Sequence, residues 1–198
     1  MIERQLATET IEKVGERVTI MGWVHARRNM GKVAFLDMRD RTGLLQTVIV
    51  PGELDDDASR AVVEGIRPEY VLKIEGEVQA RGEKQINPNM PTGTVEILAK
   101  KIEVLNTAET PPFELDRDTS AVTEEARLAY RYLDLRTERM QKNLRMRGKV
   151  FQFMRDYLTT KDFVEIETPI LTKGTPEGAR EYIVPARLYP GKFYVLPQ

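Results

Sequence analysis

The feature that most constrains the fold is a series of five runs within the first 106 residues in which apolar and polar side chains alternate. In the first run, RVTIMGWVHARR (17–28), Val18, Ile20 and Val24 share one face. The other four runs are VAFLDMRD (33–40), LLQTVIV (44–50), EYVLKIEGEVQAR (69–81) and TVEILAKKIEVLN (94–106). Alternation of this kind predicts β-strands with one buried face.

A single helical pattern interrupts the strands, between the third and the fourth. Residues 52–66, GELDDDASRAVVEGI, place acidic residues in an opening turn and an apolar cluster after it, which is typical of a short helix. Residues 82–93, GEKQINPNMPTG, are rich in Pro, Gly and Asn and predict a loop. Three strands, a helix and two strands are the layout of a five-stranded OB-fold barrel, although other small barrels share this order.

Composition excludes several classes of chemistry. The 198 residues include no Cys and one His, so we expect no disulfide, no thiol nucleophile, no zinc site built on a pair of histidines, and no metal ligand set. A formal net charge of -1 argues against binding of nucleic acid by bulk charge, but not against a local patch. No signal-peptide core and no run of about 18 apolar residues occur, so we expect a cytoplasmic protein with no membrane partner.

The second half has a different pattern. Residues 106–122 carry a Pro pair and almost no periodicity, which predicts a linker. Residues 123–136 predict a helix that begins at Thr123 as N-cap, and residues 137–160 predict a longer one. We expect a strand over FVEIETPIL (163–171), broken by Pro169, and then a loop and two more strands, EYIVPARL (181–188) and KFYVL (192–196).

Phe35 is the most informative single residue of the barrel pattern. It falls on the polar face of its strand, where a barrel of this kind can stack a nucleic-acid base. Arg27, Arg28 and Lys32 lie just before it and could hold phosphates, while Gln46 and Glu96 could read base edges. The alternative is that Phe35 fills a second small core and that the basic residues are solvated.

Two further segments carry charged residues but contain no motif that identifies a function. Lys173, Glu177 and Arg180 lie in a Gly- and Pro-rich loop, which suits either recognition of a small zwitterion or an ordinary surface hairpin. The basic residues of the long predicted helix are typical of a solvated face. No P-loop, GxSxG or HExxH motif is present.

Four segments together resemble one family. GWVHARRNMGKVAFLDMRDRTG, TEEARLAYRYLDLR, FVEIETPILTKGTPEGAREYIVPARL and GKFYVLPQ resemble, in this order, the bacterial-type aspartyl-tRNA synthetases of class II. The resemblance implies an OB-fold anticodon-binding domain over 1–105, a hinge over 106–122, and over 123–198 the incomplete start of a class II catalytic domain with its antiparallel sheet.

The resemblance also implies roles for individual barrel residues. Phe35 falls where the family stacks an aromatic ring on the central anticodon base, and Gln46 and Glu96 fall where it reads the anticodon. Arg28 and Arg81 fall where it places basic residues near the anticodon loop. Gln85 stands where the family often has Asn, so the resemblance assigns it no role.

For the second half, the resemblance implies a homodimer element, motif 1, with Pro169 as its proline, and a loop over bound L-aspartate in which Glu177 contacts the amino group. The family attaches aspartate to tRNA through an aspartyl-adenylate, using ATP and Mg²⁺. Motifs 2 and 3 are not among these residues, so we expect no catalytic residue, no bound cofactor and no pyrophosphate exchange from them alone. A relaxed Asp/Asn-charging enzyme, an asparaginyl-type relative and a stand-alone OB-fold module remain as alternatives.

Overall fold

The computed structural model describes residues 3–174 and 181–196. The chain divides into two compact units, Met1–Lys142 and Asn143–Gln198, and each is described here by itself. Helix α4 (Glu138–Thr159) contributes residues to both.

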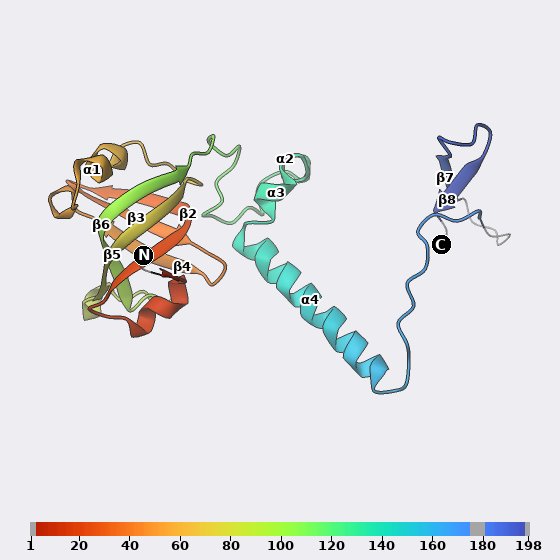
Figure 1. Cartoon of the computed structure of the whole chain (residues 1–198), viewed down its shortest axis with the longest axis horizontal. Coiled ribbons are helices and arrows are strands. Elements are labelled where there is room, and N and C mark those ends of the chain that lie inside the picture. Colours follow the sequence, from red (N-terminus) through yellow and green to blue (C-terminus); the bar gives the residue numbers. More distant parts are fainter. Residues whose placement is uncertain (1–2, 175–180, 197–198) are drawn as a thin grey trace. The chain divides into compact units, whose positions relative to one another are not determined.

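The first unit is built on a closed barrel. Its strands are β1 (Arg4–Gln5), β2 (Arg17–Met30), β3 (Val33–Arg39), β4 (Leu44–Ile49), β5 (Val71–Ala80) and β6 (Val95–Asn106). They follow one another in the sheet as β1-β2-β3-β4-β6-β5, and β2 also pairs with β5, which closes the barrel (Figure 1). The predicted five-stranded barrel is therefore confirmed.

The barrel core is formed by the apolar residues that the alternation assigned to one face. Fully buried members include Val24, Leu36, Ile49, Leu72 and Ile97. Burial of this set is the main source of the stability of the unit, because each such side chain contributes about 1.5–3 kcal/mol when it leaves water.

The predicted helix between the third and fourth long strands is α1 (Asp57–Val63), and two contacts explain its position. The Asp56 carboxylate accepts a hydrogen bond from the Ser59 amide (2.6 Å) and caps the first turn. The Ser59 hydroxyl in turn accepts from the Ile102 amide (2.8 Å), so the helix is fixed to β6.

Strand β2 changes partners along its length, which bends it around the barrel. Residues 17–23 pair with β5 and residues 23–30 pair with β3, with a bulge between Val24 and Ala26 that displaces His25 from the pairing. Gly22 lies at the crossing, where a Cβ atom would come within 2.4 Å of the Arg39 carbonyl oxygen, so this position excludes a side chain.

Several short elements were not predicted. They are β1 and the 3-10 helices η1 (Ala7–Glu12), η2 (Pro51–Glu53) and η3 (Glu83–Gln85). A two-residue strand and single turns are too short to show a hydrophobic period, so the sequence pattern could not reveal them.

The segment after the barrel begins with a stretch that has neither helix nor strand (107–123), and Leu115 and Thr119 within it are buried. The helix predicted for 123–136 is present in two pieces, α2 (Glu124–Ala129) and α3 (Arg131–Asp134). The break is at Tyr130, whose φ of -113° and ψ of 46° are not helical. The Thr123 hydroxyl accepts from the Ala126 amide (3.4 Å), which confirms the predicted N-cap.

The second unit contains most of α4, which confirms the predicted long helix, and the antiparallel hairpin of β7 (Tyr182–Pro185) and β8 (Phe193–Leu196), which confirms the last two strands. The strand predicted for 163–171 was wrong, because these residues form neither a strand nor a helix. A strand needs a neighbour for its backbone hydrogen bonds, and the pairing nearest to this segment is the bridge Thr172–Val195. Across the described ranges, no helix is long and apolar enough to cross a membrane.

Candidate nucleic-acid interface

One patch on the outer wall of the barrel collects polar side chains from several strands, and we call it the polar face. Strand register creates it, because Arg28 pairs with Phe35, and Asp37 pairs with Gln46. Directly paired residues point to the same side of a sheet. The register of β4 with β6 adds Glu96 beside Gln46. The polar face comprises Arg28, Phe35, Asp37, Gln46, Arg81 and Glu96.

Gln46 lies at the centre of the polar face, and charged groups bind both ends of its amide. Its Oε1 atom accepts hydrogen bonds from Nη2 of Arg28 (3.3 Å) and from Nη2 of Arg81 (3.1 Å). Its Nε2 atom donates to Oε2 of Glu96 (2.8 Å). Since guanidinium groups only donate and a carboxylate accepts, these neighbours fix which end of the amide carries the oxygen.

Two carboxylates hold the two arginines. Arg28 donates from Nη1 and Nη2 to the two oxygens of Asp37, each at 2.9 Å, in a bidentate pair. Nε of Arg81 lies 3.4 Å from Oε2 of Glu96, an ion-pair distance without hydrogen-bond geometry. The backbone amide of Arg81 donates to the Thr94 carbonyl (2.9 Å), which places this residue at the end of β5.

The electrostatics of the polar face are balanced, because two cations face two carboxylates around a neutral amide. Asp37 and Gln46 are buried, and the Arg81 side chain is only 10% exposed. The Arg28 side chain is 55% exposed, so a ligand meets its guanidinium first. Such a surface offers hydrogen-bond donors and acceptors with fixed directions, rather than a net charge that would attract phosphates from a distance.

Phe35 lies beside this network and on the opposite side of the sheet from the core. Its neighbours Ala34 and Leu36 are buried in the core, while Phe35 itself is half-buried and is not a member of that cluster. Its cross-strand partners are Arg28 on one side and Val48 on the other. A half-buried ring beside directed hydrogen-bonding groups has the elements of a site that stacks and reads a base.

The structure thus brings together four of the predicted residues, Arg28, Gln46, Arg81 and Glu96, and places Phe35 next to them. Asp37 was missed as a site residue, although it lies two positions after Phe35 in the same strand and therefore on the same face. The expectation that Arg27 is available for phosphate was wrong. Its guanidinium donates to the carbonyls of Val63 (2.8 Å) and Ile66 (2.7 Å), so it fixes the end of α1 instead.

The other predicted residues do not join the polar face. Lys32 is exposed on the turn between β2 and β3, and Gln85 is exposed at the end of η3. Pro169 is exposed in the coil of the second unit. Glu177, together with Arg180, lies outside the described residues. Within residues 3–174 and 181–196, no cluster of three or more His, Asp or Glu could hold a metal ion, so we assign no metal position there.

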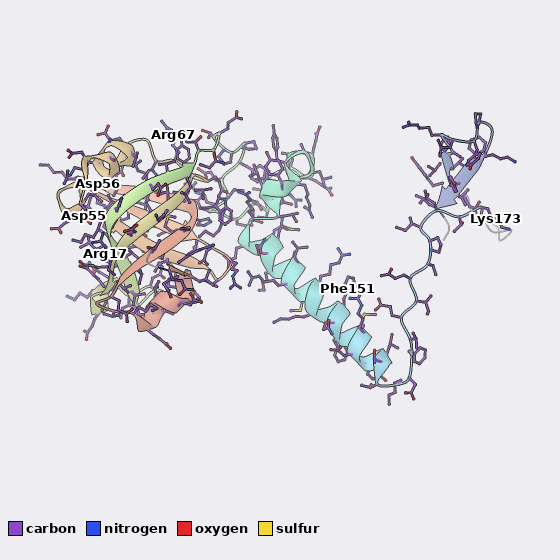
Figure 2. All side chains as sticks on the ribbon, in the orientation of Figure 1. Arg17, Asp55, Asp56, Arg67, Phe151 and Lys173 are labelled. Carbon is purple, nitrogen blue, oxygen red and sulfur yellow. The ribbon has the colours of Figure 1, made fainter. Side chains whose placement is uncertain are left out.

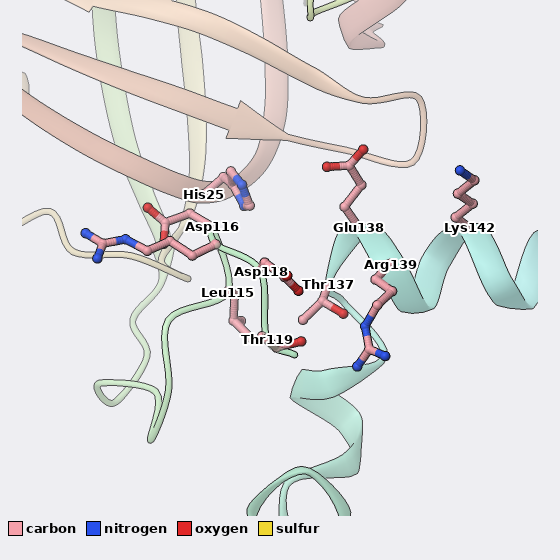
Figure 3. A pocket seen from close by; sticks show the side chains of 10 residues that line it. His25, Leu115, Asp116, Asp118, Thr119, Thr137, Glu138, Arg139 and Lys142 are labelled. Atoms are coloured by element: carbon pink, nitrogen blue, oxygen red, sulfur yellow. The ribbon is translucent and has the colours of Figure 1, made fainter. Parts of the chain in front are cut away.

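His25 belongs to a separate region of the first unit. It borders a cavity of about 370 Å³ whose other walls come from the linker and the first turns of α4 (Figure 3), including Asp116, Thr119, Glu138 and Arg139. Nη1 of Arg39 lies 3.0 Å from the His25 Nδ1 atom. Burial, and next the positive charge of Arg39, lower the pKa of His25 below its usual value, so the ring is neutral near pH 7.

The second unit exposes many large apolar side chains. Phe151 stands out from α4 (Figure 2) and borders a cavity of about 340 Å³ together with Met154, Leu158, Phe163 and Val164. Exposed apolar surfaces of this kind are typical of interaction surfaces.

Comparisons with known proteins match both halves of the chain. Residues 18–105 match the family described as OB-fold nucleic acid binding domain, and residues 123–198 match the family described as tRNA synthetases class II (D, K and N). Both parts of the predicted fold class are therefore confirmed.

Two curated bacterial relatives illustrate the similarity. The aspartate–tRNA(Asp/Asn) ligase of Rubrobacter xylanophilus is 53% identical over 187 residues, which cover 93% of this chain and 30% of the relative. The aspartate–tRNA ligase of Oceanobacillus iheyensis is 50% identical over 201 residues, which cover all of this chain and 33% of the relative. The chain thus spans about a third of the length of these relatives.

Solved structures of related synthetases are also similar to this chain. The asparaginyl-tRNA synthetase of Pyrococcus horikoshii, complexed with asparaginyl-adenylate, is similar with a TM-score of 0.80 and 27% identity, over 99% of this chain and 43% of that one. The aspartyl-tRNA synthetase of Entamoeba histolytica is similar with a TM-score of 0.73 and 26% identity, over 85% of this chain and 40% of that one.

Proposed function

We propose that this chain is part of an aspartate–tRNA ligase, because it is 50–53% identical to bacterial members over about a third of their length, and that its barrel recognises the anticodon loop of a tRNA through the polar face. In this proposal residues 1–105 form the anticodon-binding domain, residues 106–122 the hinge, and residues 123–198 the first part of the catalytic domain. The observation that carries the proposal is the position of Phe35, beside a pre-formed hydrogen-bond network and outside the core.

The chemistry of the polar face suits unpaired bases better than a duplex. Single-stranded RNA is recognised when bases stack on aromatic rings and their edges form hydrogen bonds with side chains. Phe35 supplies the ring, and Arg28 and Glu96 supply a donor and an acceptor on either side of Gln46. Both ends of the Gln46 amide already form hydrogen bonds. We therefore assign Gln46 two roles, orienting its charged neighbours and reading a base.

For the whole protein we propose the ligase reaction, in which L-aspartate and ATP form aspartyl-adenylate and the aspartyl group passes to tRNA. Mg²⁺ serves that reaction by offsetting phosphate charge. The reaction takes place in the cytoplasm, where tRNA is charged. Glu177 contacts the aspartate amino group, and α4 with the segment around Pro169 forms a homodimer interface. The exposed apolar side chains around Phe151 support this last assignment.

The curated relatives carry two names, aspartate–tRNA ligase and aspartate–tRNA(Asp/Asn) ligase, at closely similar identities. A relaxed enzyme that charges both tRNAs is therefore the second candidate. Comparison of aspartate transfer to the two tRNAs by the whole protein distinguishes them.

The direct test of the polar face is to replace the aromatic ring. Phe35→Ala should weaken binding of the aspartate-tRNA anticodon stem-loop by about 1–3 kcal/mol, or about 5- to 150-fold, because the stacked base loses its partner. Phe35→Tyr, which keeps the ring, should bind within about twofold of the wild type. Unchanged binding by Phe35→Ala in a fluorescence-anisotropy titration would show that Phe35 is only a packing residue.

A further inference from the structure

Arg136, in the segment that follows α3, binds two elements of the barrel. Nη1 of Arg136 donates to Oε2 of Glu69 (2.6 Å), a residue that precedes β5 by two positions. The Arg136 guanidinium also lies over the Trp23 ring of β2, 5.7 Å from its centre. Arg136 thus reaches two elements of the barrel, and the residue after it, Thr137, directly precedes α4.

Glu69 is held in place by its own backbone. Its φ of 66° lies in the left-handed region, which is uncommon for a residue with a side chain. Its amide donates to the Val24 carbonyl (2.7 Å), and the Val24 amide donates to the Tyr70 carbonyl (2.9 Å), so the turn is fastened beside the bulge of β2. A strained conformation fastened in this way persists because the surrounding structure determines it.

The single negative charge of Glu69 lies between two positively charged arginine side chains. Nη2 of Arg39 donates to both carboxylate oxygens (2.7 and 2.9 Å), and Arg136 binds the same group, so one buried carboxylate serves two guanidiniums. The side chain of Glu69 is 4% exposed and that of Arg39 is 15% exposed, whereas that of Arg136 is 38% exposed. Without the negative charge, the two arginines would repel each other, and Arg136 is the one that can turn into water.

We propose that Glu69 is a positioning residue that fastens the segment 130–142 to the barrel, and that loss of its charge releases this segment while the barrel stays folded. Arg39 also contacts His25 and lies on β3, so it keeps barrel partners after the release. This device joins the strand that carries Phe35 to the start of α4. It goes beyond anticodon recognition and does not depend on it.

The experiment compares Glu69→Gln and Arg136→Met in the full chain, by hydrogen exchange resolved to peptides and by fluorescence of Trp23, the single tryptophan. Each variant should accelerate exchange in 130–142 by about tenfold or more beyond any change in β3 and β4. Trp23 emission should change in both variants, because the guanidinium leaves the ring. The double variant should exchange no faster than either single variant.

The matched control is Glu103→Gln, which removes a carboxylate of the same barrel from the exposed pair with Lys73 (3.4 Å) and should change neither signal. Three results would overturn the proposal. They are uniform acceleration across the barrel in Glu69→Gln, an unchanged 130–142 segment in either single variant, or additive effects in the double variant, which would mean that the two residues act through different contacts.

Discussion

At the scale of single residues, Gln46 shows how the polar face is held ready for a ligand. Its amide contacts Arg28, Arg81 and Glu96, so each of these charges has a fixed direction before any ligand arrives. Groups that are already oriented lose little freedom on binding, which favours affinity and specificity over simple charge attraction. The cost of this arrangement is that each member depends on the others for its hydrogen bonds.

Glu96 offers a test of that dependence. Glu96→Gln leaves the buried Arg81 guanidinium without its counter-charge, so the free energy of unfolding should fall by about 1–3 kcal/mol. Glu103→Gln, in the exposed pair with Lys73, should cost less than about 1 kcal/mol. Urea unfolding of both variants measures the difference, and equal losses would show that the Glu96 network does not act as a unit.

His25 makes stability depend on pH. Its pKa is about 6.5 in the unfolded chain and is lower in the folded chain, because of burial and then of Arg39, while Asp116, Asp37 and Glu69 act in the opposite direction. The unfolded chain therefore takes up a proton first as the pH falls, so the contribution of His25 is complete above about pH 6.5 and is lost below it.

The check is to follow unfolding between about pH 7.5 and about pH 5.5 in the wild type and in His25→Gln. The wild type should lose more stability across this interval than the variant, since the variant has no imidazole to protonate. If the two proteins lose the same amount, His25 is not the group responsible.

At the scale of elements, the sequence was most informative where one hydrophobic period extends over many residues. The long strands and α4 were predictable because their apolar side chains repeat toward one core or along one helix. Residues 163–171 have the composition of a strand, but composition cannot supply the neighbouring strand that its backbone requires. The break at Tyr130 likewise has no mark in the sequence, since neither Gly nor Pro occurs in residues 123–136.

The close approach of β5 and β6 at Gly76 is a feature of the barrel that a substitution can test. A Cβ atom there would lie 2.4 Å from the Leu98 carbonyl oxygen and 2.6 Å from Cγ2 of Ile97, beside the bulge of β5 against β6. Gly76→Ala should therefore lower the free energy of unfolding by about 1–3 kcal/mol, as overpacking does.

Gly52→Ala is the matched control for Gly76→Ala, because no atom beyond the adjacent residues lies within 4 Å of the added carbon. In thermal unfolding, Gly76→Ala should have a clearly lower midpoint temperature than Gly52→Ala. Similar midpoints for both would mean that β5 and β6 can move apart at no cost, contrary to the closed barrel described here.

At the scale of the whole molecule, the sequence predicted the members of the candidate site better than their arrangement. The resemblance supplied Arg28, Phe35, Gln46, Arg81 and Glu96, and strand register then placed them on one wall. It could not show that Asp37 holds Arg28, because a bidentate pair depends on side-chain geometry that no spacing records. The roles of Pro169 and Glu177 stay predictions.

The measurement that tests the central claim most directly combines a change in the protein with a change in the RNA. Anisotropy titrations would use wild type and Phe35→Ala, each with the aspartate-tRNA anticodon stem-loop and with the same stem-loop lacking the central anticodon base. Wild type should lose about 5- to 150-fold in affinity when the base is removed, and Phe35→Ala should lose almost nothing further. Equal losses for both proteins would contradict stacking of that base on Phe35, and with it the account of the polar face.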